Sequence, residues 1–153
     1  MNVLGIDPGL SGGLAIVAGP RLVAVGDVPT TGDKAKRRVD VTALLGWIRA
    51  NPPDHAIIER AQAMPEQGSS SGFIYGRAVG ALEACVQGLM IPLTIIESTA
   101  WKKFHSLIKR DKEDSRQRAL MLFPDALGLE RKMDHNRAEA ALIAVYGIAL
   151  LRG

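Results

Sequence analysis

A chain of 153 residues with 47% hydrophobic and 23% charged side chains has an ordinary globular composition, which excludes a fibrous or disordered protein. Lys and Arg outnumber Asp and Glu by 19 to 16, so the net charge of +3 permits a polyanionic partner without requiring one. The single cysteine, Cys85, excludes an internal disulfide, and no apolar run reaches the ~18 residues of a membrane span. We expect one domain over residues 1–153 with no membrane partner. Without a signal or transit peptide, a cytoplasmic location is expected.

Three short runs rich in β-branched residues open the chain, and Gly, Pro and Ser occupy the links between them. They predict antiparallel strands joined by hairpins at residues 2–7, 13–18 and 21–28. The polar, basic stretch TTGDKAKRRVD has no periodicity and is expected to be a mobile loop. A helix over residues 40–50 and a buried strand over 55–59 follow.

Helices dominate the second half of the predicted chain. After a polar loop over 60–71, the pattern predicts a helix at 71–88, a strand at 90–97, a short helix in STAWKKFHSL and helices at 112–124 and 134–151. Three hairpin strands followed by two strands reached through helices differ from the strict alternation of a doubly wound sheet. This order indicates an α/β protein with a mixed five-stranded sheet and helices on both faces, the arrangement of the ribonuclease H-like fold.

Acidic residues end two of the predicted strands. Asp7 closes the first and Glu59 the fourth, so their side chains meet at one sheet edge if these strands are parallel neighbours. Asp134 and Glu139 lie at the start of the last helix, where Glu139 interrupts an apolar face. Singly, Asp7 could form a turn, Glu59 could be a solvated strand end and Asp134 could be an N-cap. Together they predict a cluster of carboxylates.

Such a cluster has a chemical consequence. Carboxylates this close repel one another and are tolerated at neutral pH mainly when cations neutralise them. Ligands that are all oxygen favour a hard divalent ion, Mg²⁺ or in its place Mn²⁺. Two such ions about 4 Å apart can activate a water for attack on phosphorus and stabilise the leaving oxygen. The cluster therefore predicts phosphodiester hydrolysis.

Five segments follow one another along the chain: IDPGLSGGLAIV, IIERAQAMPEQGSSSGFIYGRAVGALEA, ESTAWKKFHSL, KEDSRQRALMLFP and DHNRAEAALIA. In this order they resemble the RuvC-type Holliday-junction resolvases, in the branch found in phages, bacteria and chloroplasts. The resemblance runs from residue 2 to about residue 146. It implies a structure-selective endodeoxyribonuclease that resolves four-way DNA junctions by paired symmetric nicks, with two Mg²⁺ ions per active site and no organic cofactor.

The resemblance implies three metal-binding catalytic acids: Asp7, Glu59 and Glu139. The fourth ligand is left between two residues. The best-known bacterial members place Asp or His three residues before the helix acid, where this chain has Asn136, whereas the resembled branch uses the Asp five residues before, here Asp134. On a regular helix His135 lies about 40° from Glu139 and Asp134 about 140°. We prefer Asp134, because a helix that begins after it is not bound by this angle, and keep His135 as the alternative.

Candidates for DNA binding are basic, polar and aromatic. The segment TAWKK lies where the resembled family contacts the DNA backbone, which implies phosphate contacts by Lys102 and Lys103. Further basic candidates lie in the early loop and in the helix after residue 111: Arg37, Arg38, Lys112 and Arg116. At the start of the helix after Glu59, Ser71 could contact DNA. Phe73 could wedge into an unstacked base step or pack in the protein. Trp101 is expected in the core.

Gly72, Gly76 and Gly80 recur every four residues and weaken their helix by roughly 0.5–1 kcal/mol each, so the sheet or a second copy of this helix must compensate. A four-way junction has approximate two-fold symmetry, and a C2 homodimer would supply two active sites. Three other functions compete: a ribonuclease H-like nuclease acting on flaps or RNA–DNA hybrids, a junction-binding module without activity, and an actin-like ATPase. The last would need a second Gly-rich phosphate hairpin, which is absent from the sequence.

Overall fold

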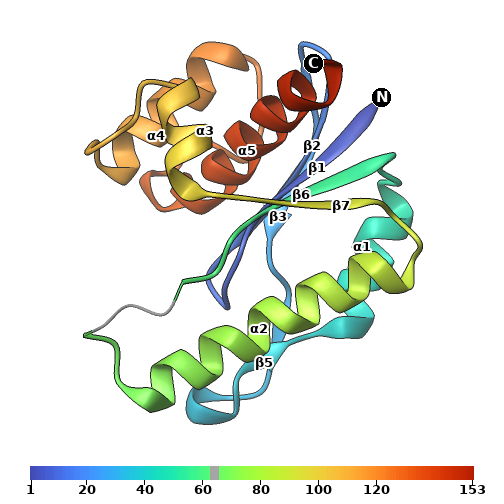
Figure 1. The fold of residues 1–153 in the computed structure, drawn as a ribbon, viewed down its shortest axis with the longest axis vertical. Coiled ribbons are helices and arrows are strands. Elements are labelled where there is room, and N and C mark those ends of the chain that lie inside the picture. The colour runs from blue at the N-terminus through green and yellow to red at the C-terminus, as the bar shows by residue number, and fades with distance from the viewer. Residues whose placement is uncertain (63–65) are drawn as a thin grey trace.

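The computed structural model describes residues 1–62 and 66–153. Within them, the main sheet has five strands in the order β3-β2-β1-β6-β7 (Figure 1). Antiparallel pairing joins β3 to β2 and β2 to β1, and parallel pairing joins β1 to β6 and β6 to β7. The strand bounds are β1 Asn2–Asp7, β2 Gly13–Ala18, β3 Arg21–Asp27, β6 His55–Glu59 and β7 Leu93–Ile96. The predicted mixed five-stranded sheet is confirmed.

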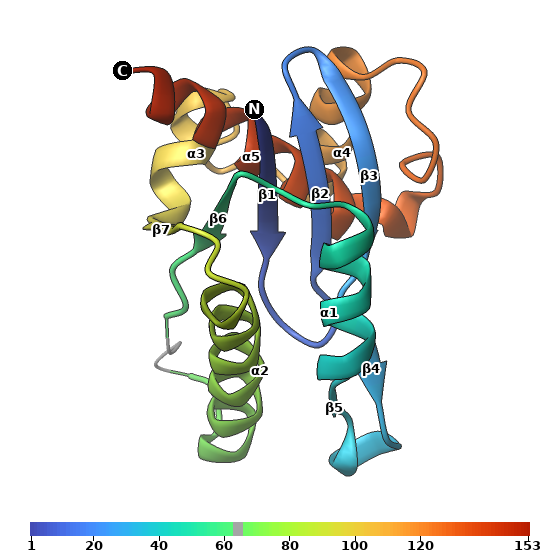
Figure 2. The same ribbon diagram turned by 90° about the vertical axis from the view of Figure 1, so that its right-hand side faces the viewer.

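Helices cover both faces of this sheet, as predicted. Figures 1 and 2 show α3, α4 and α5 on one face and α1 and α2 on the other. The helix bounds are α1 Val41–Ala50, α2 Ser69–Gly88, α3 Ser98–Phe104, α4 Lys112–Leu122 and α5 His135–Arg152. No helix in the described part of the chain is long and apolar enough to cross a membrane.

The core is divided into two layers by the alternation of side chains along the strands. Val3 and Ile57 pack on the α5 side, and Leu4 and Ile58 pack on the side of α1 and α2. The residues that share the parity of Val3 and Ile57 therefore face α5.

Two glycines let α5 lie unusually close to the sheet. A Cβ atom at Gly5 would overlap the carbonyl oxygen of Ala140, and one at Gly13 would overlap the carbonyl oxygen of Asn136. Because β1 and β2 have no side chain at these two positions, the first turns of α5 lie directly over the end of β1 that carries Asp7.

The predicted mobile loop at residues 30–40 is instead a small hairpin. It is formed by β4 Thr30–Thr31 and β5 Arg38–Val39, with a short 3₁₀ turn, Lys34–Lys36, between them. The hairpin is anchored by Val39, which is buried, and by a hydrogen bond from the Asp40 N–H to the Pro29 carbonyl. One buried residue among polar neighbours leaves no periodicity, so a loop was the wrong expectation.

Candidate active site

Asp7 and Glu59 lie at the ends of two adjacent parallel strands. Ile6 pairs with Ile58, so the next residues of β1 and β6 are neighbours across strands about 4.8 Å apart. Asp7 has the parity of Val3, and Glu59 has the parity of Ile57, so both lie on the side of α5. The predicted parallel pairing of the first and fourth strands is confirmed.

Glu139 reaches the same place from α5. Its carboxylate is buried and accepts a hydrogen bond of 3.1 Å from the hydroxyl of Ser115 on α4. Burial, and then repulsion by Glu139 and Glu59, raises the pKa of Asp7 well above its ordinary value. The charge of Glu139 also raises the pKa of Glu59, so the structure places Glu139 close to both strand-end carboxylates.

Glu59 is held by the indole of Trp101. The Trp101 Nε1–H donates a hydrogen bond of 2.6 Å to Glu59 Oε2, and the ring is fully buried, as expected for a core residue. Burial raises the pKa of Glu59, and the hydrogen bond from Trp101 opposes this rise. Across the site, burial and then the charges of Glu59 and Asp7 raise the pKa of the Tyr75 hydroxyl on α2.

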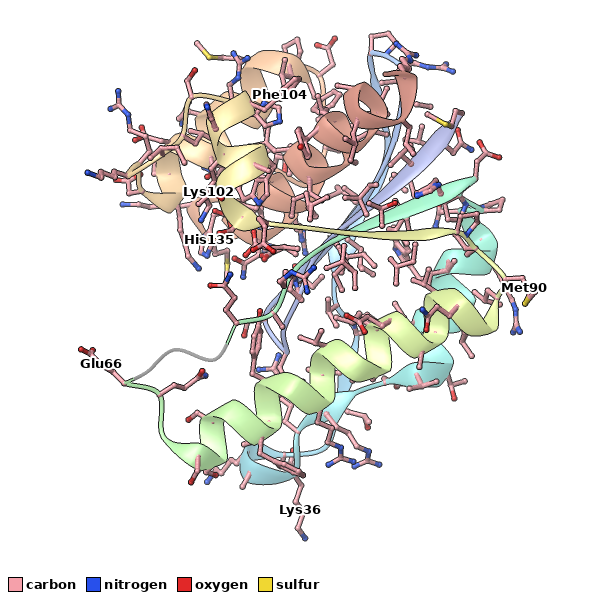
Figure 3. All side chains as sticks on the ribbon, viewed as in Figure 1. Lys36, Glu66, Met90, Lys102, Phe104 and His135 are labelled. Atoms are coloured by element: carbon pink, nitrogen blue, oxygen red, sulfur yellow. The ribbon has the colours of Figure 1, made fainter. Side chains whose placement is uncertain are left out.

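Two lysines balance part of this negative charge. Lys112 and Lys102 each lower the pKa of Asp7, and Lys102 also lowers that of Glu59. The Lys102 ammonium lies 5.3 Å from the centre of the Trp101 ring, and Figure 3 shows its side chain on the same side of the molecule as His135. The predicted DNA-contacting residues Lys102 and Lys112 therefore lie beside the carboxylates.

A cavity of about 380 Å³ opens next to Asp7. Its walls include the turn Pro8–Gly12 after β1, Lys112 at the start of α4, and Ser71 and Tyr75 of α2. Asp7 and Lys112 thus line the same cavity. Ser71, predicted to contact DNA, lines this cavity.

The donor set suits a hard divalent cation, although the side chains are not already closed around one. In residues 1–62 and 66–153 no three acidic, histidine or cysteine side chains form a ready metal-binding group. Trp101 and Ser115 each engage one oxygen of a carboxylate, which leaves the second oxygen of Glu59 and of Glu139 without these contacts. The three carboxylates carry like charges that repel one another, and Mg²⁺ or Mn²⁺ would neutralise this charge.

Asp134 lies outside this group of three carboxylates. Its buried side chain accepts hydrogen bonds from the Arg131 N–H and guanidinium at 2.9 and 2.8 Å, and Arg137 lies 3.5 Å away. Burial opposes its ionisation, but the contacts with Arg131 and then Arg137 prevail and lower the pKa of Asp134. Two arginines engage the Asp134 carboxylate in this structure, and the assignment of Asp134 as the fourth ligand stays a prediction.

The first turn of α5 presents a different residue to the cavity. The Asn136 side chain lines the cavity next to Asp7, and its amide donates a hydrogen bond to the Ser11 carbonyl. His135, the alternative ligand, has its ring Nδ1 3.3 Å from the Lys132 carbonyl oxygen. Asn136 stands three residues before Glu139, whereas Asp134, the preferred fourth ligand of the sequence analysis, stands five residues before it.

Of the remaining DNA-binding candidates, some are exposed, some lie beside a second cavity, and one is bound to other residues of the protein. Lys103 is exposed on α3, and Phe73 is 72% exposed on α2, so both are accessible to a ligand. Arg37 and Arg38 lie in the hairpin beside a second, larger cavity.

Arg116, the other basic candidate, is committed to the protein itself. Its guanidinium forms an ion pair of 2.6 Å with Glu113 and donates to the carbonyl oxygens of Leu129 and Glu130 at 3.0 Å, and its side chain is only 12% exposed. Arg116 thus has a structural role here, and its contact with phosphate stays a prediction.

Sequence reasoning did not find the hydrogen-bond donors that hold the carboxylates. Ser115 and Ala119 occupy the buried face of α4, and a hydroxyl at such a position needs a partner. A buried indole likewise needs an acceptor for its N–H. Ser115 and Trp101 each carry this signal, but only the fold identifies the acceptor.

Comparison with known proteins agrees with this architecture. No protein-family model and no curated protein matches the chain. The structure is similar to that of T. thermophilus RuvC in complex with Holliday junction substrate, with a TM-score of 0.77 and 22% identity over 99% of this chain and 95% of that one. A second Thermus thermophilus RuvC structure gives a TM-score of 0.70 and 19% identity over 98% and 96% of the two chains. The predicted ribonuclease H-like fold is confirmed, and the resemblance to RuvC is confirmed as one of fold.

Proposed function

We propose that this protein is a metal-dependent endodeoxyribonuclease that resolves four-way DNA junctions by paired symmetric nicks. The observation that carries the proposal is the proximity of Glu59 and Glu139 to Asp7, which lines a cavity together with Lys112. The similarity to RuvC, which has been seen in complex with a Holliday junction, supports the choice of substrate. Branched DNA is accordingly the proposed partner.

In the proposed mechanism Asp7, Glu59 and Glu139 hold Mg²⁺, or Mn²⁺ in its place, with two ions per site. Ions held by these carboxylates would supply activation of a water and charge stabilisation at the leaving oxygen. Trp101 and Ser115 fix the carboxylates of Glu59 and Glu139, so less side-chain freedom is lost when the substrate binds.

The lysines have a separate role in this mechanism. Lys102 and Lys112 attract the phosphodiester toward Asp7 and offset the repulsion between substrate and carboxylates. Such contacts position the DNA backbone without reading its sequence. Selectivity for branched DNA therefore has to come from shape, in agreement with a structure-selective enzyme.

The proposed assembly is a homodimer. Added Cβ atoms at Gly72, Gly76 and Gly80 would meet nothing within 4 Å in the described structure, so this face of α2 is open to a partner. A second copy placed there would supply the second active site that paired nicks require.

The function is tested by a panel of labelled substrates: a four-way junction, a flap, a linear duplex and an RNA–DNA hybrid, each with Mg²⁺ and with chelator. We expect paired nicks on the junction with Mg²⁺ and no cleavage with chelator. Asp7→Asn should reduce the cleavage rate by at least about 10³-fold, because the site loses a carboxylate ligand. Asp125→Asn, which changes an exposed carboxylate far along the chain, is the matched control and should cut normally.

Other outcomes would identify another function. Cleavage of the hybrid or the flap alone would assign the protein to a different class of ribonuclease H-like nuclease. Tight junction binding without cleavage under any metal condition would make it a binding module.

A further inference from the structure

Helices α3, α4 and α5 each carry one residue of the candidate site, and they lie together on one face of the sheet (Figures 1 and 2). In this order the residues are Trp101, Ser115 and Glu139. About one turn further along each helix stands a residue of a second group: His105, Arg118 and Leu142. Residues three or four apart share a face of a helix, so the second group adjoins the first on all three helices.

His105 joins two of these helices. Its ring Nε2 lies 2.9 Å from the Leu142 carbonyl oxygen, and its backbone N–H donates to the Trp101 carbonyl at 3.1 Å. Because a carbonyl oxygen only accepts, Nε2 carries a proton and donates it. The residue is buried, so this bond does not compete with water. The helix that holds Glu59 through Trp101 is thereby fastened to the helix that carries Glu139.

Burial of His105 has a free-energy cost for folding. Its Nδ1 is buried and has no hydrogen-bond partner among the described residues, and the same holds for Nε of Arg118. Burial lowers the pKa of His105, the bond to Leu142 opposes this, and the charge of Arg118 lowers it further. The imidazole is therefore neutral at neutral pH and buries a nitrogen that an apolar side chain would not have. Stability alone does not favour a histidine at this position.

The surroundings of His105 fix the orientation of its ring. The ring of Phe104, labelled in Figure 3, meets it edge-on with 4.9 Å between the two centres. Phe104 also meets the ring of Tyr146 on α5 at 5.5 Å. From α4 the charge of Arg118 acts on the imidazole, whereas α5 presents an uncharged carbonyl and a phenol. The bond at Nε2 is thus made by a neutral ring that is held in place.

We propose that His105 is a positioning residue for the metal-binding carboxylates, because its bond to α5 keeps Glu59 and Glu139 at a fixed separation. The inference rests on the proposed function, since it takes these two carboxylates to hold the divalent ion. They come from different elements, and an ion shared between them is bound tightly only where their spacing is maintained. Without His105 each carboxylate would keep its own donor, but α3 and α5 could shift against each other.

The test measures the affinity for Mn²⁺ alone, from the electron paramagnetic resonance signal of the free ion, at a pH where His105 is neutral. His105→Leu removes the donor and should weaken Mn²⁺ binding about fivefold, the factor that corresponds to one hydrogen bond. His105→Gln keeps an N–H near the position of Nε2 and should restore the affinity to within about twofold of the wild type. A residue that only stabilised the fold would not produce this difference between the two variants.

Thermal unfolding is recorded for the same proteins. We expect His105→Leu to unfold near the temperature of the wild type, because the loss of one hydrogen bond and the removal of the unpartnered Nδ1 act in opposite directions. Should this variant fail to fold, the wild type itself decides. Addition of Mg²⁺ should move the Hε1 resonance of His105 in the nuclear magnetic resonance spectrum and leave that of His55 in place.

His55→Leu is the matched control. His55 begins β6, whereas Glu59 ends it, and the ring Nε2 of His55 lies 2.8 Å from the Thr94 hydroxyl oxygen. The substitution therefore removes a side-chain hydrogen bond of the same kind at the far end of the strand. We expect this variant to bind Mn²⁺ within about twofold of the wild type.

The inference and the proposed function fail in different ways. If the wild type cuts the junction but His105→Leu binds Mn²⁺ as tightly as the wild type, His105 has no positioning role while the proposed function stands. The inference is also overturned if His105→Gln or His55→Leu loses as much affinity as His105→Leu, or if Mg²⁺ leaves the His105 resonance unmoved. If the affinity depends on His105 but the wild type never cuts a junction, the proposed function fails and the positioning role remains.

Discussion

Two side-chain hydrogen bonds hold carboxylates of the candidate site. Trp101 donates to Glu59, and Ser115 donates to Glu139. Both donors are buried, so neither bond competes with water. An ion that binds Glu59 must therefore change the surroundings of an indole, which makes the site observable by fluorescence.

We predict that Mg²⁺ or Mn²⁺ changes the emission of Trp101 in a Trp47→Phe background, where it is the only remaining indole. Ser115→Ala should weaken the affinity about fivefold, since one buried hydrogen bond contributes about 1 kcal/mol to holding Glu139. Ser115→Thr retains the hydroxyl and should restore the affinity. Exposed Ser106→Ala is the control. A titration without any change in emission, or one unaffected by Glu59→Gln, would contradict the assignment of Glu59 as a ligand.

The raised pKa of Asp7 makes stability depend on pH when no divalent ion is bound. The folded protein favours the protonated form, so the contribution of Asp7 is fully present below its unfolded pKa, near 4. It is lost as pH rises from there through the folded value. In chelator, the free energy of unfolding should therefore fall above pH 4. Asp7→Asn should make this fall smaller, by about 1.4 kcal/mol for every pH unit between the two pKa values of Asp7, while the raised pKa of Glu59 leaves a remainder.

Urea denaturation between pH 4 and pH 8 measures this effect, with Asp125→Asn as the variant that should leave the curve unchanged. Addition of Mg²⁺ should restore stability to the wild type at neutral pH, because ligand binding to the folded state stabilises it. A wild-type curve that falls no more steeply in chelator than that of Asp7→Asn would contradict the raised pKa of Asp7.

At the scale of elements, α5 can lie close to the sheet because β1 has a glycine, Gly5, where the helix crosses it. A Cβ at Gly5 would lie 3.0 Å or less from the backbone and side chain of Ala144, besides its overlap with Ala140. We predict that Gly5→Ala lowers the free energy of unfolding by about 3 kcal/mol or more and lowers activity with it, because α5 carries Glu139.

The comparison variant is Gly46→Ala on α1, where an added Cβ meets nothing within 4 Å. Alanine has a higher helix propensity than glycine, so this change should raise the stability by about 0.5–1 kcal/mol. Urea unfolding of both variants checks the pair. If Gly5→Ala were as stable as the wild type, α5 could not lie on β1 as described.

Sequence patterns predicted elements where periodicity was strong. The strands that end in Asp7 and Glu59, and the apolar helix that carries Glu139, were found with bounds close to those observed. The hairpin at residues 30–40 was missed, because its stability comes from the burial of Val39 against distant elements. The pattern of apolar and polar residues within a segment does not reveal contacts with residues far along the chain.

At the scale of the whole molecule, the sequence does not reveal which charged side chains come into contact in the folded protein. Asp134 and Asn136 flank His135 in the sequence, yet arginines engage Asp134 while Asn136 faces the cavity of Asp7. A helical angle could not separate these cases, because Asp134 precedes α5 and its neighbours are set by tertiary structure. The convergence of Asp7, Glu59 and Glu139 was predictable, since parallel strands bring their ends together.

The two-layer core also decides how the surfaces of the molecule are used. The α5 side carries the carboxylates and both lysines, whereas the face of α2 with Gly72, Gly76 and Gly80 lies on the opposite layer. A partner copy on that face would leave the carboxylate side free for DNA. The proposed dimer would thus leave the carboxylates and the two lysines accessible to the substrate.

The Arg37 guanidinium joins the hairpin to the turn behind Asp7, because it donates to both the Thr30 hydroxyl and the Leu10 carbonyl. The backbone beside the carboxylates is therefore braced by an element that periodicity alone did not predict.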